Sequence, residues 1–85
     1  MPLDLLYFGA LRESLGRDGE RVDPPSHVLT ADDLLSWLMG QGEPYASAFA
    51  DRTRIRVAVE AESAGPDSTI FGANEVAFFP PPGAL

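Results

Sequence analysis

The stretch "EVAFFPPPGAL", from Glu75 to Leu85, decides the fold of this chain and raises the question of its function. Its first five residues are an apolar run with the composition of a β-strand. The prolines that follow end the pairing of that strand, because proline has no N–H group to donate. Proline also favours extended backbone, so residues 80–85 are predicted to project as a semi-rigid arm of about 20 Å. Chain ends are usually polar and frayed, and a stiff, apolar arm therefore indicates a defined binding place.

The length and composition predict one small domain, residues 1–85, that ends in the tail 80–85. No apolar run approaches the roughly 20 residues of a membrane span, so no membrane partner is expected. The N-terminus lacks the basic region and cleavage site of a signal peptide. Because the chain also has no cysteine, we expect a cytoplasmic location.

The formal net charge is −7, with thirteen acidic residues against six basic ones, and every basic residue is arginine. An acidic chain repels phosphate backbones, so nucleic acid is not expected as a partner. The acidity would suit a basic protein surface, or it would serve solubility alone, and composition by itself favours solubility. A chain without cysteine has no thiol nucleophile or thiolate metal site, and the single histidine, His27, is predicted to lie in a surface loop.

Two helices are predicted from local signals. The clearer one is "TADDLLSWLMG", in which Thr30 is the N-cap, Gly40 the stop, and the apolar residues recur at helical spacing. A shorter helix is predicted from about Ala10 to Gly16, where Arg12 and Glu13 either contact a partner or form a solvated pair. Residues 44–50 add one or two further helical turns.

Strands are predicted at 3–8, at about 21–23, at 54–60 and at 75–79, and "SAGPDSTIFGANE" is predicted as a loop. Prolines directly after the second strand place it at an edge of the sheet. The order of the elements predicts an α+β fold with one sheet and helices on one of its faces.

The open face of this sheet is expected to be polar, because it would face water. Side chains alternate along a strand, and that alternation places apolar residues on the same face as several charged ones. If strands 3–8, 54–60 and 75–79 are neighbours, the apolar members form one patch with a charged border: Leu6, Phe8, Ala58, Ala77 and Phe79. Such a patch is typical of a protein docking site. The alternatives are an error in the strand register or a loop folded over the face.

The arm continues this patch through Pro80, Pro81 and Pro82 and ends in Gly83, Ala84 and Leu85. Its only charge is the terminal carboxylate. Adenylation by a partner would convert that carboxylate into a mixed anhydride, and a sulfide donor could then displace AMP to leave a thiocarboxylate. Because the chain has no cysteine, any sulfur that it carries must sit on this C-terminal carbonyl.

The motifs "YFGALRESLG", "RVAV" and "EVAFFPP" resemble those of the molybdopterin synthase small subunit family, over essentially the whole chain. The resemblance implies a ubiquitin-like β-grasp fold with one mixed sheet. It implies a non-catalytic sulfur carrier in molybdenum cofactor biosynthesis that binds no cofactor or metal itself. The implied partners are an adenylating, E1-like enzyme that uses ATP and the large subunit, which binds the pterin precursor, with a heterotetramer as the assembly.

One departure from the family concerns the reactive end. The family ends in Gly-Gly, and Ala84 and Leu85 occupy those two positions here. The side chain of Leu85 lies next to the reacting carbon and should hinder a tight channel. A divergent carrier, a paralog that docks without transferring sulfur, and an altered terminus all remain open.

Other functions also remain open at this stage. The chain could be a non-catalytic interaction module or a carrier for another sulfur pathway, such as that of thiamine. It could also be a modifier attached to lysines of other proteins, although no modifier chain could grow on a protein that has no lysine.

Overall fold

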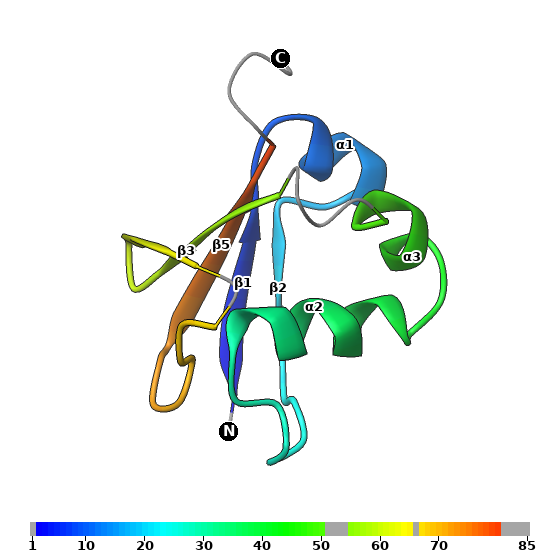
Figure 1. Ribbon diagram of the computed structural model, residues 1–85. Coiled ribbons are helices and arrows are strands. Elements are labelled where there is room, and N and C mark those ends of the chain that lie inside the picture. The colour runs from blue at the N-terminus through cyan, green and yellow to red at the C-terminus, as the bar shows by residue number, and fades with distance from the viewer. Residues whose placement is uncertain (1, 51–54, 66, 81–85) are drawn as a thin grey trace.

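The computed structural model describes residues 2–50, 55–65 and 67–80. Within them the chain forms a mixed sheet with helices on one face, which confirms the predicted α+β class (Figure 1). The elements follow the order β1 (Leu3–Tyr7), α1 (Ala10–Leu15), β2 (Gly19–Val22), α2 (Ala31–Met39), α3 (Tyr45–Ala48), β3 (Arg56–Val59), β4 (Glu62–Ala64) and β5 (Glu75–Phe79).

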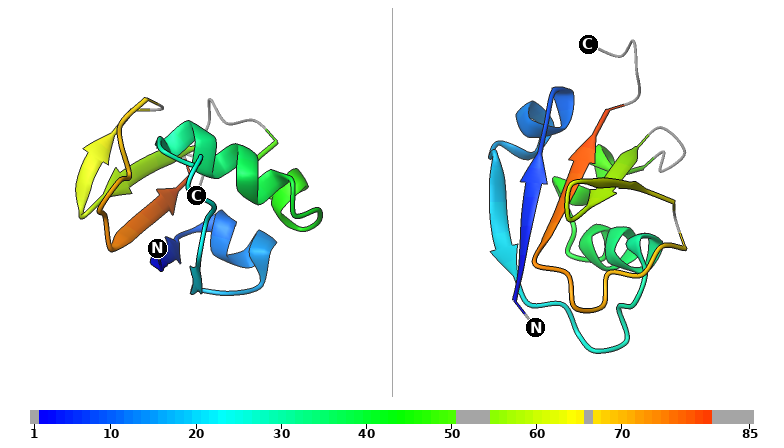
Figure 2. Two further views of the ribbon diagram at one scale, coloured as in Figure 1. Left: turned by 90° about the horizontal axis from the view of Figure 1, so that it is seen from below. Right: turned by 90° about the vertical axis from the view of Figure 1, so that its left-hand side faces the viewer.

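The last strand of the chain lies in the middle of the sheet, whose order is β2-β1-β5-β3-β4 (Figure 2). β5 runs parallel to β1 and antiparallel to β3, and the other neighbours are antiparallel. The predicted neighbourhood of strands 3–8, 54–60 and 75–79 is therefore confirmed. β2 lies at an edge, as the prolines that follow it indicated.

Two strand predictions need correction. The second strand is Gly19–Val22 instead of 21–23, because Gly19 pairs with Leu6 and is more than a turn residue. Glu62–Ala64, most of which was predicted as loop, forms β4 and pairs with β3. A strand of three residues shows no alternation long enough to detect. β3 covers Arg56–Val59, and residue 54 of the predicted strand lies outside the described residues.

The helices begin and end where the local signals predicted. α1 ends at Gly16, which adopts the left-handed conformation that glycine tolerates (φ 74°). α2 begins with a capping box, in which the Thr30 hydroxyl accepts from the Asp33 N–H and the Asp33 carboxylate accepts from the Thr30 N–H. The same carboxylate accepts from the Leu29 N–H, and these hydrogen bonds lower the pKa of Asp33.

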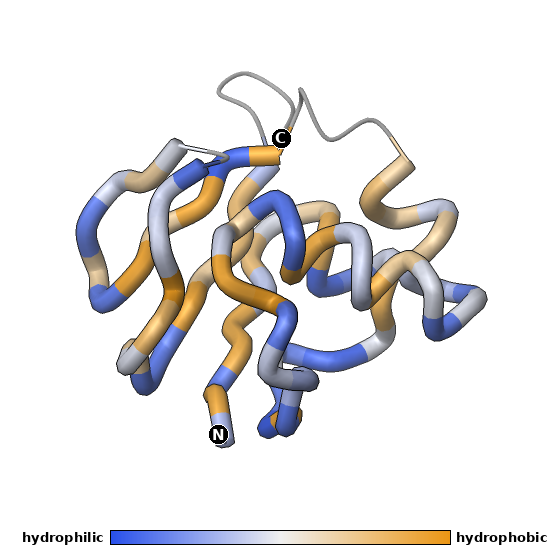
Figure 3. The backbone as a smooth tube through the Cα atoms, turned by 60° about the horizontal axis from the view of Figure 1, so that its bottom comes forward, coloured by the Kyte–Doolittle hydropathy of each residue, from blue (hydrophilic) through white to orange (hydrophobic). Residues whose placement is uncertain are grey.

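The core between sheet and helices is centred on three aromatic rings, from β1, β5 and the end of α3. The Phe78 ring centroid lies 5.3 Å from that of Phe49 and 6.0 Å from that of Tyr7. All three side chains are almost completely buried, and the apolar face of α2 packs against the same cluster. Figure 3 shows hydrophobic stretches along the strands and hydrophilic residues gathered in the connecting loops.

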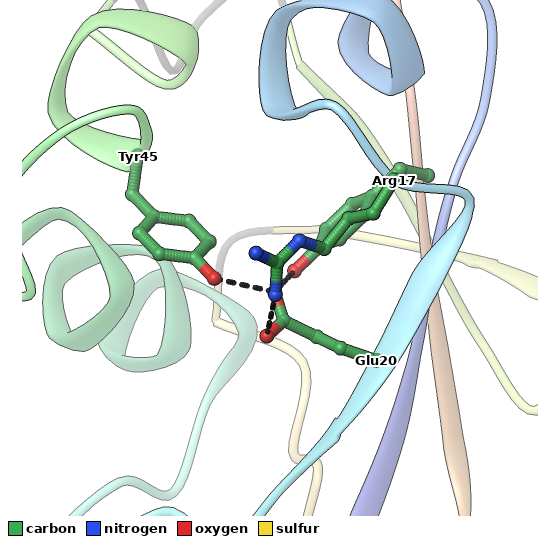
Figure 4. Close-up of polar contacts among 4 residues, drawn as sticks. Arg17, Glu20 and Tyr45 are labelled. Atoms are coloured by element: carbon green, nitrogen blue, oxygen red, sulfur yellow. Dashed lines mark hydrogen bonds and ion pairs between the residues drawn. The ribbon is translucent and has the colours of Figure 1, made fainter.

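A polar network ties α3 to the edge of the sheet (Figure 4). The Tyr7 and Tyr45 hydroxyls both donate to Oε2 of Glu20, at 2.7 and 2.6 Å, and Arg17 donates to Oε1 at 2.9 Å. Burial, followed by the hydrogen bond to the Glu20 carboxylate, raises the pKa of both tyrosines. The network therefore holds two protonated phenols against one carboxylate.

This network predicts a loss of stability at alkaline pH. The folded-state pKa of each tyrosine lies above the unfolded value of about 10, so the stabilisation is complete below pH ~10 and is lost as the pH rises further. The chain has no lysine or cysteine, so no other side chain titrates near this pH. Denaturation between pH 8 and 12 should show the free energy of unfolding falling above pH ~10. The Tyr7→Phe/Tyr45→Phe double variant should show a flatter slope, and an unchanged slope would contradict the assignment.

The turn between β3 and β4 contains two residues in the left-handed region, Glu60 (φ 53°) and Ala61 (φ 69°). Glu60 has a compensating role, because its carboxylate accepts from the Asn74 and Glu75 N–H groups. Ala61 has no hydrogen-bonding side chain, and its Cβ makes this conformation costly.

We therefore expect Ala61→Gly to raise the free energy of unfolding by about 1 kcal/mol, because glycine adopts a positive φ without steric strain. Ala64→Gly, in the neighbouring strand, is the matched control and should lower it by roughly 0.5–1 kcal/mol. Urea denaturation of both variants measures the difference. Equal losses in the two variants would contradict a strained turn.

Candidate functional site

The face of the sheet that carries no helix has a band of small and apolar residues across it. Leu6 pairs with Gly19 on one side and with Ala77 on the other, and Ala77 pairs with Ala58. Residues that are paired in register share a face, so these four form a continuous row from β2 to β3. Figure 2 (right) looks onto this face, with α2 and α3 behind the sheet.

Ala77 is the most buried member of this row, with only 6% of its surface exposed. It lies on the open face, but its side chain is short and lies between those of Leu6 and Ala58. The latter two side chains are half-buried. The middle of the face is therefore low and apolar, without a charged side chain to solvate it.

The band ends at a stacked pair of aromatic rings. Phe8 directly follows β1 and Phe79 ends β5, and their ring centroids lie 4.7 Å apart with the planes 6° from parallel. The Phe8 N–H donates to the Phe78 carbonyl at 3.1 Å, which extends the β1–β5 pairing by one residue. Phe8 remains 40% exposed. The stack fixes the Phe79 ring next to Pro80, where the predicted arm begins.

Charged residues border the opposite end of the same face. Asp4 pairs with Arg21 on β2 and with Glu75 on β5, and Arg21 donates to the Asp4 carboxylate at 2.9 Å. This hydrogen bond lowers the pKa of Asp4. The pair is exposed and contributes little to stability. An apolar centre with a charged border is the usual organisation of a protein interface.

The five residues predicted to form the patch therefore lie on one face: Leu6, Phe8, Ala58, Ala77 and Phe79. The alternative of a wrong strand register is excluded by the observed pairing. Pro80 is half-buried beside Phe79. The remaining predicted site residues, Pro81, Pro82, Gly83, Ala84 and Leu85, lie outside the described residues.

The role of Gly19 in this face could not be predicted from the sequence. A Cβ at this position would come within 2.4 Å of the Leu5 carbonyl oxygen and 3.2 Å of a Leu6 methyl carbon. A side chain would therefore displace the backbone of β1. The absence of one keeps the face low beside Leu6. The dipeptide "DG" pointed only to a turn.

Two kinds of feature are absent from the described part of the chain. Residues 2–50, 55–65 and 67–80 contain no group of three His, Asp or Glu side chains placed to hold a metal ion. In the same part of the chain, no helix is long and apolar enough to cross a membrane.

A mixed five-stranded sheet with the last strand at its centre and helices on one face is the ubiquitin-like β-grasp arrangement. Solved structures of this class are similar to the chain. SAMP1 from Haloferax volcanii matches with a TM-score of 0.73, 24% identity and complete coverage of both chains. A second structure, of small archaeal modifier protein 1 from H. volcanii, has a TM-score of 0.69 and 26% identity, covering 94% of this chain and 97% of the other.

A candidate molybdopterin converting factor subunit 1 from Pyrococcus furiosus matches with a TM-score of 0.74 and 19% identity, covering 95% of this chain and 98% of the other. A search of curated proteins found no match. The ThiS family model matches residues 5–83, and the chain belongs to the ThiS family. Membership supports a sulfur-carrier role, and proteins of this kind typically work with a partner enzyme.

Proposed function

We propose that the chain is the sulfur carrier subunit of molybdopterin synthase. It would take sulfur from an adenylating enzyme and donate it, from a C-terminal thiocarboxylate, to the pterin precursor in the large subunit. The observation that carries the proposal is the apolar open face, which ends at the Phe8–Phe79 stack, one residue before Pro80. The resemblance of "YFGALRESLG" and "EVAFFPP" to the small subunit family and the similarity to the Pyrococcus protein support it.

The chemistry requires only the terminal carboxylate of this chain. That carboxylate attacks the α-phosphate of ATP, and pyrophosphate leaves as the acyl adenylate forms. Hydrosulfide, or a donor that delivers it, attacks the acyl carbon and expels AMP, which leaves the thiocarboxylate. Transfer of the sulfur to the pterin precursor, with water replacing it on the acyl carbon, regenerates the carboxylate. The partners would bind ATP, the sulfide donor and the pterin precursor, while the carrier would bind to each partner and present its C-terminal carboxylate.

The reaction predicts a change of mass. After incubation with the adenylating enzyme of the same organism, ATP and sulfide, the intact chain should gain about 16 Da from the exchange of oxygen for sulfur. The Ala84→Gly/Leu85→Gly variant removes the bulk beside the acyl carbon and should react roughly tenfold faster or more. If neither protein gains mass, the carrier function is wrong. If only the variant does, the chain is a docking module whose end does not transfer sulfur.

The docking face predicts a separate loss of binding. Phe79→Asp places a charge in the proposed interface beside the Phe8 ring and should weaken binding to the adenylating enzyme and to the large subunit at least tenfold, as loss of an aromatic anchor does. Phe71→Asp, at an exposed aromatic residue away from this face, is the matched control and should bind like the parent chain. Calorimetric titration measures both, with circular dichroism to confirm folding. Unchanged binding by Phe79→Asp would show that the open face of the sheet does not bind these partners.

The similarity to the two H. volcanii structures favours a second function, that of a protein modifier. A modifier would be recovered from cells as conjugates joined to lysines of other proteins. A carrier subunit would be recovered unconjugated, in a heterotetramer with the large subunit. Intact-mass analysis of a tagged chain purified from its own organism separates the two functions.

A further inference from the structure

A second apolar site lies at the end of β1 opposite the Phe8–Phe79 stack, between the loops that precede α2 and β5. It is a pocket of about 160 Å³. Its walls are formed by residues from the base of β1 and from those two loops: Leu3, Pro24, Pro25, Ser26, Val28, Leu29, Ile70, Phe71 and Ala73. An apolar cavity of about 150 Å³ holds a benzene-sized group, so this pocket has room for one large side chain.

Hydrogen bonds between the two loops hold the pocket in shape. Thr30 and Thr69 form an isolated β-bridge, and the Ile70 N–H donates to the Leu29 carbonyl at 3.0 Å. The Ala73 N–H donates to the Ile70 carbonyl at 3.0 Å, which closes the turn that carries Phe71. A site held in this way loses little entropy when it binds.

Two of the residues that line this pocket have large apolar side chains that are exposed to solvent. Phe71 is 75% exposed and Leu29 is 50% exposed, and together with Phe8 they are the exposed large hydrophobic residues of the described chain. Phe71 and Leu29, unlike Phe8, do not belong to the open face of the sheet. Exposed aromatic and aliphatic residues beside a pocket are the usual anchor points of an interface.

The charged residues that lie close in sequence to the lining residues are mostly acidic. Asp23 precedes the lining residue Pro24, and Asp32 and Asp33 lie in the first turn of α2, where the Asp33 carboxylate accepts from the Leu29 N–H. Asp67 lies two residues before Thr69 in the facing loop. No lining residue is basic, and His27 is the one histidine of these loops. The surroundings therefore favour a cationic ligand.

We propose that this pocket binds a basic segment of a partner protein, with one large apolar side chain of that segment in the pocket and flanking arginines or lysines against the aspartates. A second copy of the chain fits poorly as the occupant, because each copy carries a net charge of −7 and their acidic rims would repel. Acidic peptides and anionic small molecules fit poorly for the same reason.

The proposal does not depend on the sulfur-carrier function. The pocket lies at the start of β1, whereas the Phe8–Phe79 stack lies at the other end of β1 and β5. A basic partner could therefore bind while the open face and the arm are engaged elsewhere. Variants at Phe71 and at Phe79 should separate the two activities.

The experiment is a nitrogen-15 NMR titration of the full chain with the peptide acetyl-RRFRR-amide. Saturable shifts are expected at the amides of residues 28–29 and 70–73. The peptide acetyl-RRARR-amide should bind about tenfold more weakly or worse, because it leaves the pocket empty. Phe71→Ser should weaken acetyl-RRFRR-amide about tenfold as well, whereas Phe8→Ser, at an exposed aromatic of the open face, should leave its affinity unchanged.

Three results would overturn the proposal. Equal affinity for the phenylalanine and alanine peptides would show that charge alone attracts them. Equal affinity for acetyl-EEFEE-amide would show that the aspartates near the pocket do not favour a basic peptide over an acidic one. Concentration-dependent shifts at residues 70–73 without peptide would identify a second copy as the occupant. Since none of these measurements uses the C-terminus, the sulfur-carrier function can fail without affecting them.

Discussion

The pairing of β5 between β1 and β3 is the interaction on which the rest of this structure depends. It places Val76 and Phe78 against the helices, where both are completely buried, and Ala77 and Phe79 on the opposite face. A strand at the centre of a sheet is apolar on both sides when both sides are to be covered. Here one side is covered by this chain's own helices, and the other is bare in the described structure.

The position of β5 also links the bare face to the end of the chain. β5 is the last strand of the described residues, and it ends at Phe79, at the edge of the apolar band and next to the Phe8 ring. Docking of that face would bring Phe79 and Pro80 against the partner. This geometry suits a carrier whose reactive group is its own terminus, because no side chain of the site then needs to do chemistry. The proposed thiocarboxylate would let a chain without cysteine serve in sulfur transfer.

The sequence was sufficient to predict the helix ends and the alternation of side chains along the strands, because a few neighbouring residues determine each of them. The capping box of α2 lies within four residues, and the αL stop of α1 is one glycine. The alternation within β1, β3 and β5 predicts which residues of each strand share a face, but Leu6, Ala58 and Phe79 come together only through the pairing of the three strands. The hydrogen bonds of Glu20 were out of reach, because they join residues 13 and 25 positions apart. The pocket between the loops that precede α2 and β5 was missed for the same reason, since it depends on a bridge between Thr30 and Thr69.

The central claim is that the open face of the sheet is covered by the partner that acts on the chain's end. Hydroxyl-radical footprinting of the complex with the adenylating enzyme tests it most directly, because aromatic side chains report their own exposure. Phe8 and Phe79 should be protected in the complex, while Phe71, 75% exposed and away from the face, serves as the internal reference and stays reactive. Equal oxidation of Phe8 and Phe79 in the free and bound chain would contradict the account.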